Sequence, residues 1–571
     1  MRKPVPFLML AIWLGCLVAY AQTVTIDSPR EVRIAEGTKL CDQADGLVAE
    51  RKYAEALSLY RDVLKILPTS PRAKGGVAAC EGKLKEAAAA PKAVVETPKP
   101  APVAQAAPPA APLAVPVAMA SPTVQLGRRL LPPNPDDYEA YSMFGEMLDW
   151  TKSTVSQYKK LPEGNMLIVT AHGWDPGGQL EDGQLVTLVQ ELREIRCPVV
   201  LTLLKQTKLT TAGYAQLAGL PNVVALAVQQ CATVDDEVLA SFAKIPALRS
   251  LMLNECHKVT DVGVKRLAAL QDLQYLNVAK CELVTSEGVK ALSACPKLAS
   301  LNLWGTQGFA DVTALTGLTS LRALVMFSKL DSKTLPELGK LKKLQTLNMS
   351  GNNFERDYSF LAALPELETL TIADDHMLSD IGKSDLAGCR NLKSLSLPNC
   401  GGLTGSVAPL AALTQLESLS LSYCQEFTGE GLRELAVLPK LEALSITEAS
   451  KVGSPALGEI AALTQLKSLN LWNCDLSDAG LAQLASLKGL QKVGLAGKAI
   501  TDVTLQLLGG LPALEEVSLR DTIEVTDAGL LALAQAPAMK RVAIRYSKVT
   551  PAGIGAAKAA KPGLVTEVIA P

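Results

Sequence analysis

Pairs of apolar residues in a Leu-x-Leu pattern recur along most of this chain at a spacing of 23 to 25 residues. Because side chains alternate along a strand, each pair predicts a short strand with both apolar residues on one face. Self-similarity at this period predicts a solenoid, in which each unit buries its apolar face against its neighbours. The fifteen pairs begin at Leu201, Leu226, Leu251, Leu276, Leu301, Leu324, Leu347, Leu370, Leu395, Leu419, Leu444, Leu469, Val493, Val517 and Val542.

The polar residues after each strand predict a turn and then a helix. In residues 251–270, Thr260 has the side chain and position of a helix N-cap, and Asp261 places negative charge at the helix N-terminus. Val264, Leu267 and Leu270 follow at helical spacing. Each repeat is therefore expected to contain one strand and one helix that packs back on the sheet.

One position, five residues after the first leucine, holds a small side chain in most repeats. It is occupied by Cys231, Cys256, Cys281, Cys400, Cys424 and Cys474, and elsewhere by Thr306, Asn352, Thr522 and Ser547. A position that accepts Cys, Thr, Asn or Ser is a structural one inside a turn, so we expect buried thiols here, although the sequence leaves a disulfide between neighbouring repeats open.

These features together resemble the cysteine-containing subfamily of leucine-rich repeats, the kind found in F-box-associated and bacterial repeat proteins. The strand, the cysteine position and the Thr-Asp-x-Gly helix start recur in phase over about residues 198–560. The resemblance implies an α/β solenoid with a parallel sheet on the concave side and helices on the convex side. Repeats from Leu301 to Leu370 depart from the pattern, because they are 23 residues long and lack the cysteine.

The rest of the chain divides by composition. Residues 1–21 have a charged start, an apolar stretch and the small-x-small end Ala19-Tyr20-Ala21, which predicts a cleaved signal peptide and export to the periplasm or the cell exterior. Lipid anchoring at Cys16 is the minority alternative. Residues 22–88 resemble one tetratricopeptide unit, and residues 89–122 are an Ala/Pro-rich linker.

The remaining residues are assigned to an N-terminal capping region, 123–197, followed by the solenoid, 198–571. Within the cap, the pattern predicts a helix over 136–160, a strand over 165–170 and a helix over 185–195. Residues 171–175, which include His172, are expected to form a loop of the cap.

Candidate binding residues follow from strand alternation, since three positions in each repeat point away from the core. Most of them are small and polar, so the large or charged ones stand out as candidate contacts with a partner. Trp304 and Phe327 occupy equivalent positions in successive repeats and should be neighbours. The full set is Tyr275, Trp304, Phe327, Tyr423, Trp472, Arg520, Arg545 and Tyr546, of which Tyr423 and Tyr546 lie one step further along, at the strand ends. Arg541 would extend the arginines into a basic patch.

Composition and motifs exclude several classes of function. The net charge is −1 and the chain has three histidines, which gives no basic footprint for nucleic acid and little material for a zinc or histidine-based site. No phosphate-binding loop, dinucleotide fingerprint or nucleophile elbow is present, so we expect no cofactor and no catalytic residue. No segment after the first 21 residues is apolar enough to span a membrane.

The sequence thus predicts an exported, non-enzymatic scaffold that binds a protein on the concave face of its solenoid. Two alternatives stay open: a secreted effector that acts as a substrate adaptor, and an envelope protein that binds a cell-surface polysaccharide.

Overall fold

The computed structural model describes residues 123–127, 166–172, 179–327, 330–351, 358–376, 378 and 385–569, together with six isolated positions in the first 100 residues. The chain forms two compact units, residues 1–118 and 119–571. In the first unit the six positions, Ala56, Leu57, Leu59, Arg61, Val77 and Cys80, are helical. The predicted signal peptide, linker and helix over 136–160 lie outside the described residues, as does most of the tetratricopeptide-like unit.

The second unit is built on one sheet in which strands pair in chain order. The strands β2 to β18 are parallel, and β1 pairs antiparallel with β2 at the N-terminal edge. Their bounds are β1 (Thr123–Gly127), β2 (Met166–His172), β3 (Val199–Leu204), β4 (Val223–Gln229), β5 (Ser250–Met252), β6 (Tyr275–Asn277), β7 (Ser300–Trp304), β8 (Ala323–Phe327), β9 (Thr346–Ser350), β10 (Thr369–Ala373), β11 (Ser394–Ser396), β12 (Ser418–Ser420), β13 (Ala443–Ser445), β14 (Ser468–Leu471), β15 (Lys492–Ala496), β16 (Glu516–Arg520), β17 (Arg541–Arg545) and β18 (Val565–Ile569).

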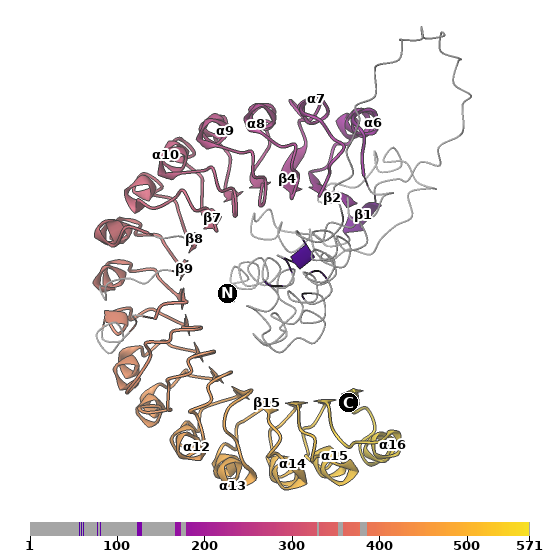
Figure 1. Cartoon of the computed structure of the whole chain (residues 1–571), viewed down its shortest axis with the longest axis vertical. Helices are drawn as coiled ribbons and strands as arrows, with labels where there is room; N and C mark the ends of the chain where they lie inside the picture. Colours follow the sequence, from indigo (N-terminus) through magenta and orange to yellow (C-terminus); the bar gives the residue numbers. More distant parts are fainter. Residues whose placement is uncertain are drawn as a thin grey trace, which may run out of the picture. The chain divides into compact units, whose positions relative to one another are not determined.

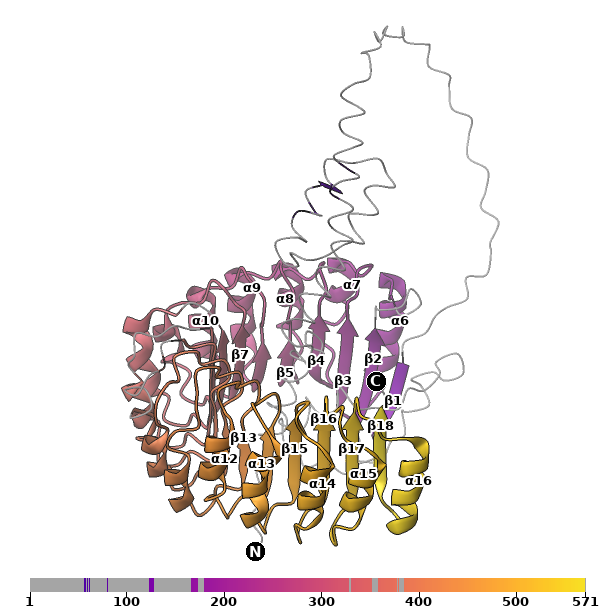
Figure 2. The ribbon, with the colours of Figure 1, turned by 60° about the horizontal axis from the view of Figure 1, so that its bottom comes forward.

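Helices form a second layer on the outer side of this sheet (Figures 1 and 2). The α-helices are α6 (Asp182–Arg193), α7 (Thr211–Ala215), α8 (Asp236–Phe242), α9 (Asp261–Arg266), α10 (Ser286–Ala291), α12 (Ser454–Ile460), α13 (Asp478–Leu481), α14 (Asp502–Gly509), α15 (Asp527–Ala534) and α16 (Pro551–Ala560). The 3-10 helices are η5 (Leu267–Ala269), η6 (Leu292–Ala294), η7 (Val312–Leu315), η8 (Ser332–Lys340), η9 (Ser359–Ala363), η10 (Ala408–Ala412), η11 (Arg433–Val437) and η12 (Ala482–Ser486).

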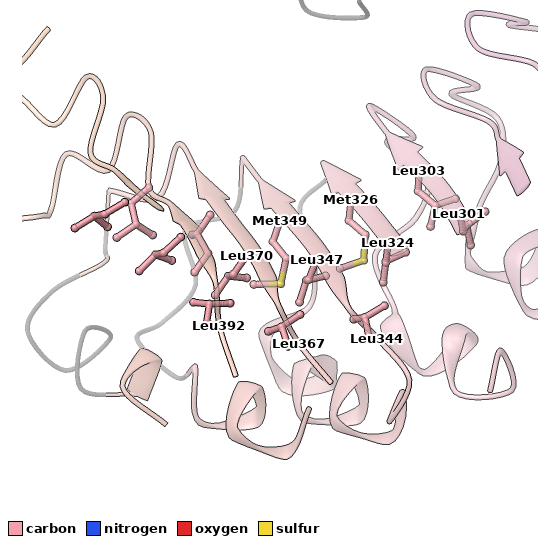
Figure 3. Packing of buried hydrophobic residues seen from close by; sticks show 14 of the residues in the cluster. Leu301, Leu303, Leu324, Met326, Leu344, Leu347, Met349, Leu367, Leu370 and Leu392 are labelled. Atoms are coloured by element: carbon pink, nitrogen blue, oxygen red, sulfur yellow. The ribbon is translucent and has the colours of Figure 1, made fainter. Parts of the chain in front are cut away.

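The strand register confirms the predicted repeat in every unit. Leu201 pairs with Leu226, and the pairing continues through the first residue of each predicted pair to Val542. In Figure 3 the two apolar residues of each strand, such as Leu324 and Met326, point into the layer between the sheet and the helices, where Leu344 from the adjacent loop joins them. The core is therefore one continuous ladder of Leu, Val, Ile and Met.

In the middle of the solenoid, the 3-10 helices η7 to η11 take the place of α-helices in most of the described repeats, whereas Asp385 and Leu386 are α-helical. A 3-10 helix rises about 2.0 Å per residue against 1.5 Å for an α-helix, so it spans the same layer with fewer residues. This is consistent with the 23-residue repeats between Leu301 and Leu370. These repeats also lack the Thr-Asp helix start.

The cysteine position acts as a hydrogen-bond donor to the preceding repeat. Cys281 Sγ lies 3.2 Å from the carbonyl oxygen of Leu253, and Thr306 Oγ1 lies 3.1 Å from that of Val278. Cys256, Cys400, Cys424 and Cys474 repeat this contact. All ten described cysteines are free, and the six at this position are buried, which confirms the expected buried thiols.

The Thr-Asp-x-Gly motif joins neighbouring repeats, which the sequence did not reveal. Thr526 caps its own helix, as expected, but Asp502 of the previous helix accepts hydrogen bonds from the Thr526 backbone N–H (2.8 Å) and hydroxyl (2.6 Å). Gly529 leaves room for this carboxylate, because a Cβ there would lie 2.3 Å from Asp502 Oδ1. The same arrangement joins α8 to α9, α9 to α10 and α15 to α16.

The cap region agrees with the prediction at two elements and differs at others. The strand expected over 165–170 is β2, and the helix expected over 185–195 is α6, shifted by two to three residues. The expected loop over 171–175 is wrong at its start, since Ala171 and His172 belong to β2 and pair with Leu203 and Leu204. Strands β1 and β18 were not predicted.

Candidate interaction surface

The concave face of the sheet presents three positions per repeat. We call them the first row (before the first core residue), the second row (between the two core residues) and the third row (after the second). Over β6 to β14 these rows comprise 27 positions, nine strands with three each, and none carries Asp, Glu, Lys, Arg or His. Serine, threonine, asparagine and alanine dominate. This stretch is a neutral surface with short side chains.

Charged side chains stand instead along the two edges of the strands. At the N-terminal edge, Glu368 pairs with Lys393 at 2.7 Å and Glu442 with Lys467 at 2.6 Å, each across neighbouring repeats. These pairs are a third to a half exposed, so they add little stability. These charged side chains lie at the edge of the sheet, and the centre of the concave face over β6 to β14 stays uncharged.

The residue after the third row has a left-handed backbone in almost every described repeat. Glycine fits this conformation best, and asparagine and aspartate tolerate it. The non-glycine residues there are Lys205, Gln230, Glu255, Lys280, Asp374, Asn399, Tyr423, Glu448, Asn473, Asp521 and Tyr546. In nine of these eleven residues, all but Asn473 and Tyr546, the backbone N–H donates to the third-row carbonyl of the next repeat, as in Glu255 to Ala279 (2.9 Å). The side chains line the C-terminal edge, where Asn473 Nδ2 donates to Glu448 Oε1 (2.5 Å).

Trp304 and Phe327 form an aromatic pair in the third row, as expected from their equivalent positions. They are register partners on β7 and β8, with ring centroids 5.4 Å apart and planes inclined by 38°. Lys280 Nζ lies 5.0 Å from the Trp304 ring centroid, within cation–π range, and 3.0 Å from Glu255 Oε1. Gly351 lies under the Phe327 ring, because a Cβ there would come within 2.6 Å of it.

The aromatic pair of Trp304 and Phe327 is held in a defined arrangement by its neighbours in the chain itself. Both rings are half-buried, so each retains an exposed surface while its orientation is fixed by the other ring, by Lys280 and by Gly351. The sequence prediction missed Lys280 and Gly351. Their positions in the repeat could have indicated them, because both stand four residues after the first core leucine of their repeat.

The other aromatic candidates do not join this pair. Tyr275 stands in the first row of β6, and Trp472 is in the third row after β14, separated from Phe327 by five strands. Tyr423 and Tyr546 are in left-handed positions beyond their strands, and Tyr546 is 40% exposed. Among the described residues, the concave face thus has one contacting aromatic pair and no longer row of aromatic side chains on which a polysaccharide could stack.

The arginine candidates have acidic neighbours. Arg520 Nε lies 3.8 Å from Asp521 Oδ2, and Arg541 lies 3.4 Å from Glu567 Oε1. Arg545 is exposed in the third row of β17. The predicted basic patch is thus largely compensated.

The described residues give no evidence of a metal site or of a reactive thiol. No group of three or more His, Cys, Asp and Glu side chains there could hold a metal ion. Burial raises the pKa of the Cys281 and Cys474 thiols to about 12, so they are protonated and poorly nucleophilic at neutral pH. Among the described residues, no helix is long and apolar enough to cross a membrane.

Family models match the repeat that the sequence predicts and the structure shows. A family model described as a leucine-rich repeat region matches residues 287–535, and a second leucine-rich repeat model matches residues 269–293. The matched residues therefore have the leucine-rich repeat pattern, and the strand register shows the α/β solenoid fold of such repeats. Proteins of this class typically bind other proteins and are typically not enzymes.

Individual relatives are distant. A Trypanosoma equiperdum protein, whose name assigns it to the regulation of adenylate cyclase, is 28% identical over 126 residues, or 22% of this chain and 20% of that protein. An internalin of Listeria monocytogenes is 19% identical, with a TM-score of 0.36 over 70% of this chain and 89% of its own. A leucine-rich repeat protein of Leptospira interrogans is also 19% identical, with a TM-score of 0.37 over 62% of this chain and 91% of its own.

Proposed function

We propose that this protein is an exported, non-enzymatic scaffold that binds a protein partner on the concave face of its solenoid. The observation that carries the proposal is the half-buried pair of Trp304 and Phe327 on an otherwise uncharged surface of short side chains. Aromatic residues held in place lose little conformational entropy on binding, and Trp is among the residues enriched at binding hot spots. Short neighbours let the partner approach the sheet closely.

The partner would therefore present an apolar side chain to the aromatic pair and uncharged polar groups to the Ser, Thr and Asn rows. A strongly charged partner would leave its ions desolvated against a neutral surface, which costs several kcal/mol per ion. Export rests on the signal-like pattern of residues 1–21. N-terminal sequencing of the mature protein should then give Gln22 as the first residue.

The test is a crosslinking pull-down from an extract of the native organism, with the tagged chain as bait. A Trp304→Ala/Phe327→Ala variant is compared with Val437→Ala, which removes a side chain that is 69% exposed on η11 in the convex layer. We expect one protein to be captured by the unmodified chain and by Val437→Ala. The aromatic variant should bind it at least about 30-fold more weakly, as loss of one hot spot of about 2 kcal/mol implies.

Equal capture by both variants would move the binding site away from the concave face. Circular dichroism and urea unfolding of each variant show whether a loss of binding reflects a loss of folding. Capture of polysaccharide without protein would overturn the proposal.

A further inference from the structure

Two asparagines beside the aromatic pair have a fixed side-chain orientation. Asn277 and Asn302 are register partners in the second row of β6 and β7. The Oδ1 atom of Asn277 accepts a hydrogen bond from the backbone N–H of Ala279 (2.9 Å). In the same way, Asn302 Oδ1 accepts one from the backbone N–H of Trp304 (2.9 Å). A backbone N–H can only donate, so the atom that faces it must be the amide oxygen, and each Nδ2 group points away from that N–H.

The polar groups that this surface offers to a partner are hydrogen-bond donors. Neither Nδ2 group has an acceptor among the described residues, and neither does the indole Nε1 of Trp304. All three side chains are half-buried, so they keep an exposed surface. The other side chains in the second and third rows of β6 to β8 are those of Ala279, Val325 and Phe327, which have no polar atoms. Within these two rows, the side chains therefore offer donors and no acceptor that lacks a partner.

A segment that binds here must accept hydrogen bonds without needing to donate them. An ordinary extended segment carries one backbone N–H per residue, and each N–H that contacts this surface would lose its water partner without gaining an acceptor. Proline has a carbonyl oxygen but no backbone N–H, and its side chain is apolar. The polyproline II helix leaves its carbonyl groups free, because it has no internal hydrogen bonds. Proline-rich segments in this conformation bind to grooves lined by aromatic side chains in several kinds of recognition domain.

We propose that the partner contacts β6 to β8 with a proline-rich segment in the polyproline II conformation. Its carbonyl oxygens accept hydrogen bonds from the Nδ2 groups of Asn277 and Asn302 and from Trp304 Nε1, and a proline ring packs on the aromatic pair. Two strand spacings of about 4.8 Å separate β6 from β8, and the polyproline II helix rises about 3.1 Å per residue. One turn of three residues therefore spans the three strands. Such a segment is uncharged, which matches the neutral surface.

The direct test measures the binding of a fluorescein-labelled peptide of ten prolines to the full chain by fluorescence anisotropy. An Asn277→Asp/Asn302→Asp variant keeps an oxygen facing each backbone N–H but replaces both outward donors with acceptors. We expect this variant to bind decaproline at least about tenfold more weakly, as the loss of two hydrogen bonds implies. The unmodified chain should bind an alternating Gly/Ser peptide of the same length at least about tenfold more weakly than decaproline, because the Gly/Ser peptide carries N–H donors and is flexible.

The matched control is Ser445→Asp/Asn470→Asp, which places the same two charges in the same row on the neighbouring strands β13 and β14. It should bind decaproline as tightly as the unmodified chain does. Circular dichroism and urea unfolding show whether each variant is folded. Trp304→Phe removes the third donor but keeps an aromatic ring, so it should bind at least about threefold more weakly, and it replaces the first variant if that one does not fold. Unchanged affinity of the folded variant, or equal affinity for the two peptides, would overturn the proposal.

This inference rests on the proposed function, because it concerns the same surface, but the two fail in different ways. An excess of decaproline added to the pull-down should displace the captured protein. A protein that is captured through the aromatic pair and is not displaced would refute the proline-rich ligand and leave the scaffold function standing. Decaproline binding that depends on Asn277 and Asn302, without capture of any protein, would support the ligand chemistry and refute the proposed function.

Discussion

Replacing Gly529 with alanine tests whether the Thr-Asp-x-Gly motif holds neighbouring repeats together. An alanine in a helix is ordinarily more stable than a glycine by up to about 1 kcal/mol. At Gly529, however, the added Cβ would lie 2.3 Å from Asp502 Oδ1 and 2.9 Å from Leu505 Cδ2. The carboxylate must then move away from Thr526.

The magnitude follows from the two hydrogen bonds that Asp502 accepts from Thr526. Each hydrogen bond to a charged group contributes about 1.5–3 kcal/mol, and the lower value applies at this half-buried site, giving about 3 kcal/mol for the two. Subtracting about 1 kcal/mol for the better helix former leaves a net destabilisation of about 2 kcal/mol. We therefore expect Gly529→Ala to unfold at lower urea concentration than the unmodified chain.

The matched control is Gly555→Ala in α16, where the added Cβ meets nothing within 4 Å. It should stabilise the protein slightly, so the same substitution has opposite signs at the two sites. Because solenoids can unfold locally, hydrogen exchange of a peptide covering β16 and α15 should accompany urea unfolding. In an Asp502→Ala background the cost of Gly529→Ala should shrink. A Gly529→Ala variant as stable as Gly555→Ala would refute the reasoning.

Three further predictions concern the cysteine position and the helix starts. Cys281→Thr should unfold within about 0.5 kcal/mol of the unmodified chain in urea, because Thr306 fills the equivalent position. Cys281→Val, which is isosteric with the threonine variant, leaves the Leu253 carbonyl with the Cys256 N–H as its remaining donor and should cost about 1 kcal/mol. Equal stability of the two variants would show that the position needs only volume. Burial raises the pKa of Cys281 to about 12 and that of Cys295 to about 11, so both should resist a disulfide reagent at pH 8 until urea unfolds the chain, and rapid labelling in native buffer would contradict their burial. Burial alone would raise the pKa of Asp478, but hydrogen bonds from Thr501 and Thr504 lower it below the ordinary value. A carboxyl whose pKa is depressed on folding stabilises the protein above its unfolded pKa of about 3.9 and loses that contribution as pH falls through the folded value, so urea unfolding should show a smaller loss of stability between pH 5 and pH 2 for Asp478→Asn, and an unchanged loss would exclude this carboxylate as a contributor.

The amino-acid sequence determined the repeat, the register and the direction of each core side chain. Leu-x-Leu at a fixed period leaves one arrangement that buries both residues of every pair, and a shift by one residue would expose them all. For the same reason, the equivalent positions of Trp304 and Phe327 in successive repeats were enough to predict that the two side chains are neighbours. The cysteine position was readable because Cys, Thr and Ser share a small size and a donor.

Contacts between repeats were decided by the tertiary structure. Asp502 and Thr526 are 24 residues apart, and only the stacking of α14 on α15 shows that the carboxylate serves the next helix. The positions of Lys280 over Trp304 and of Gly351 under Phe327 likewise depend on the distance between adjacent strands.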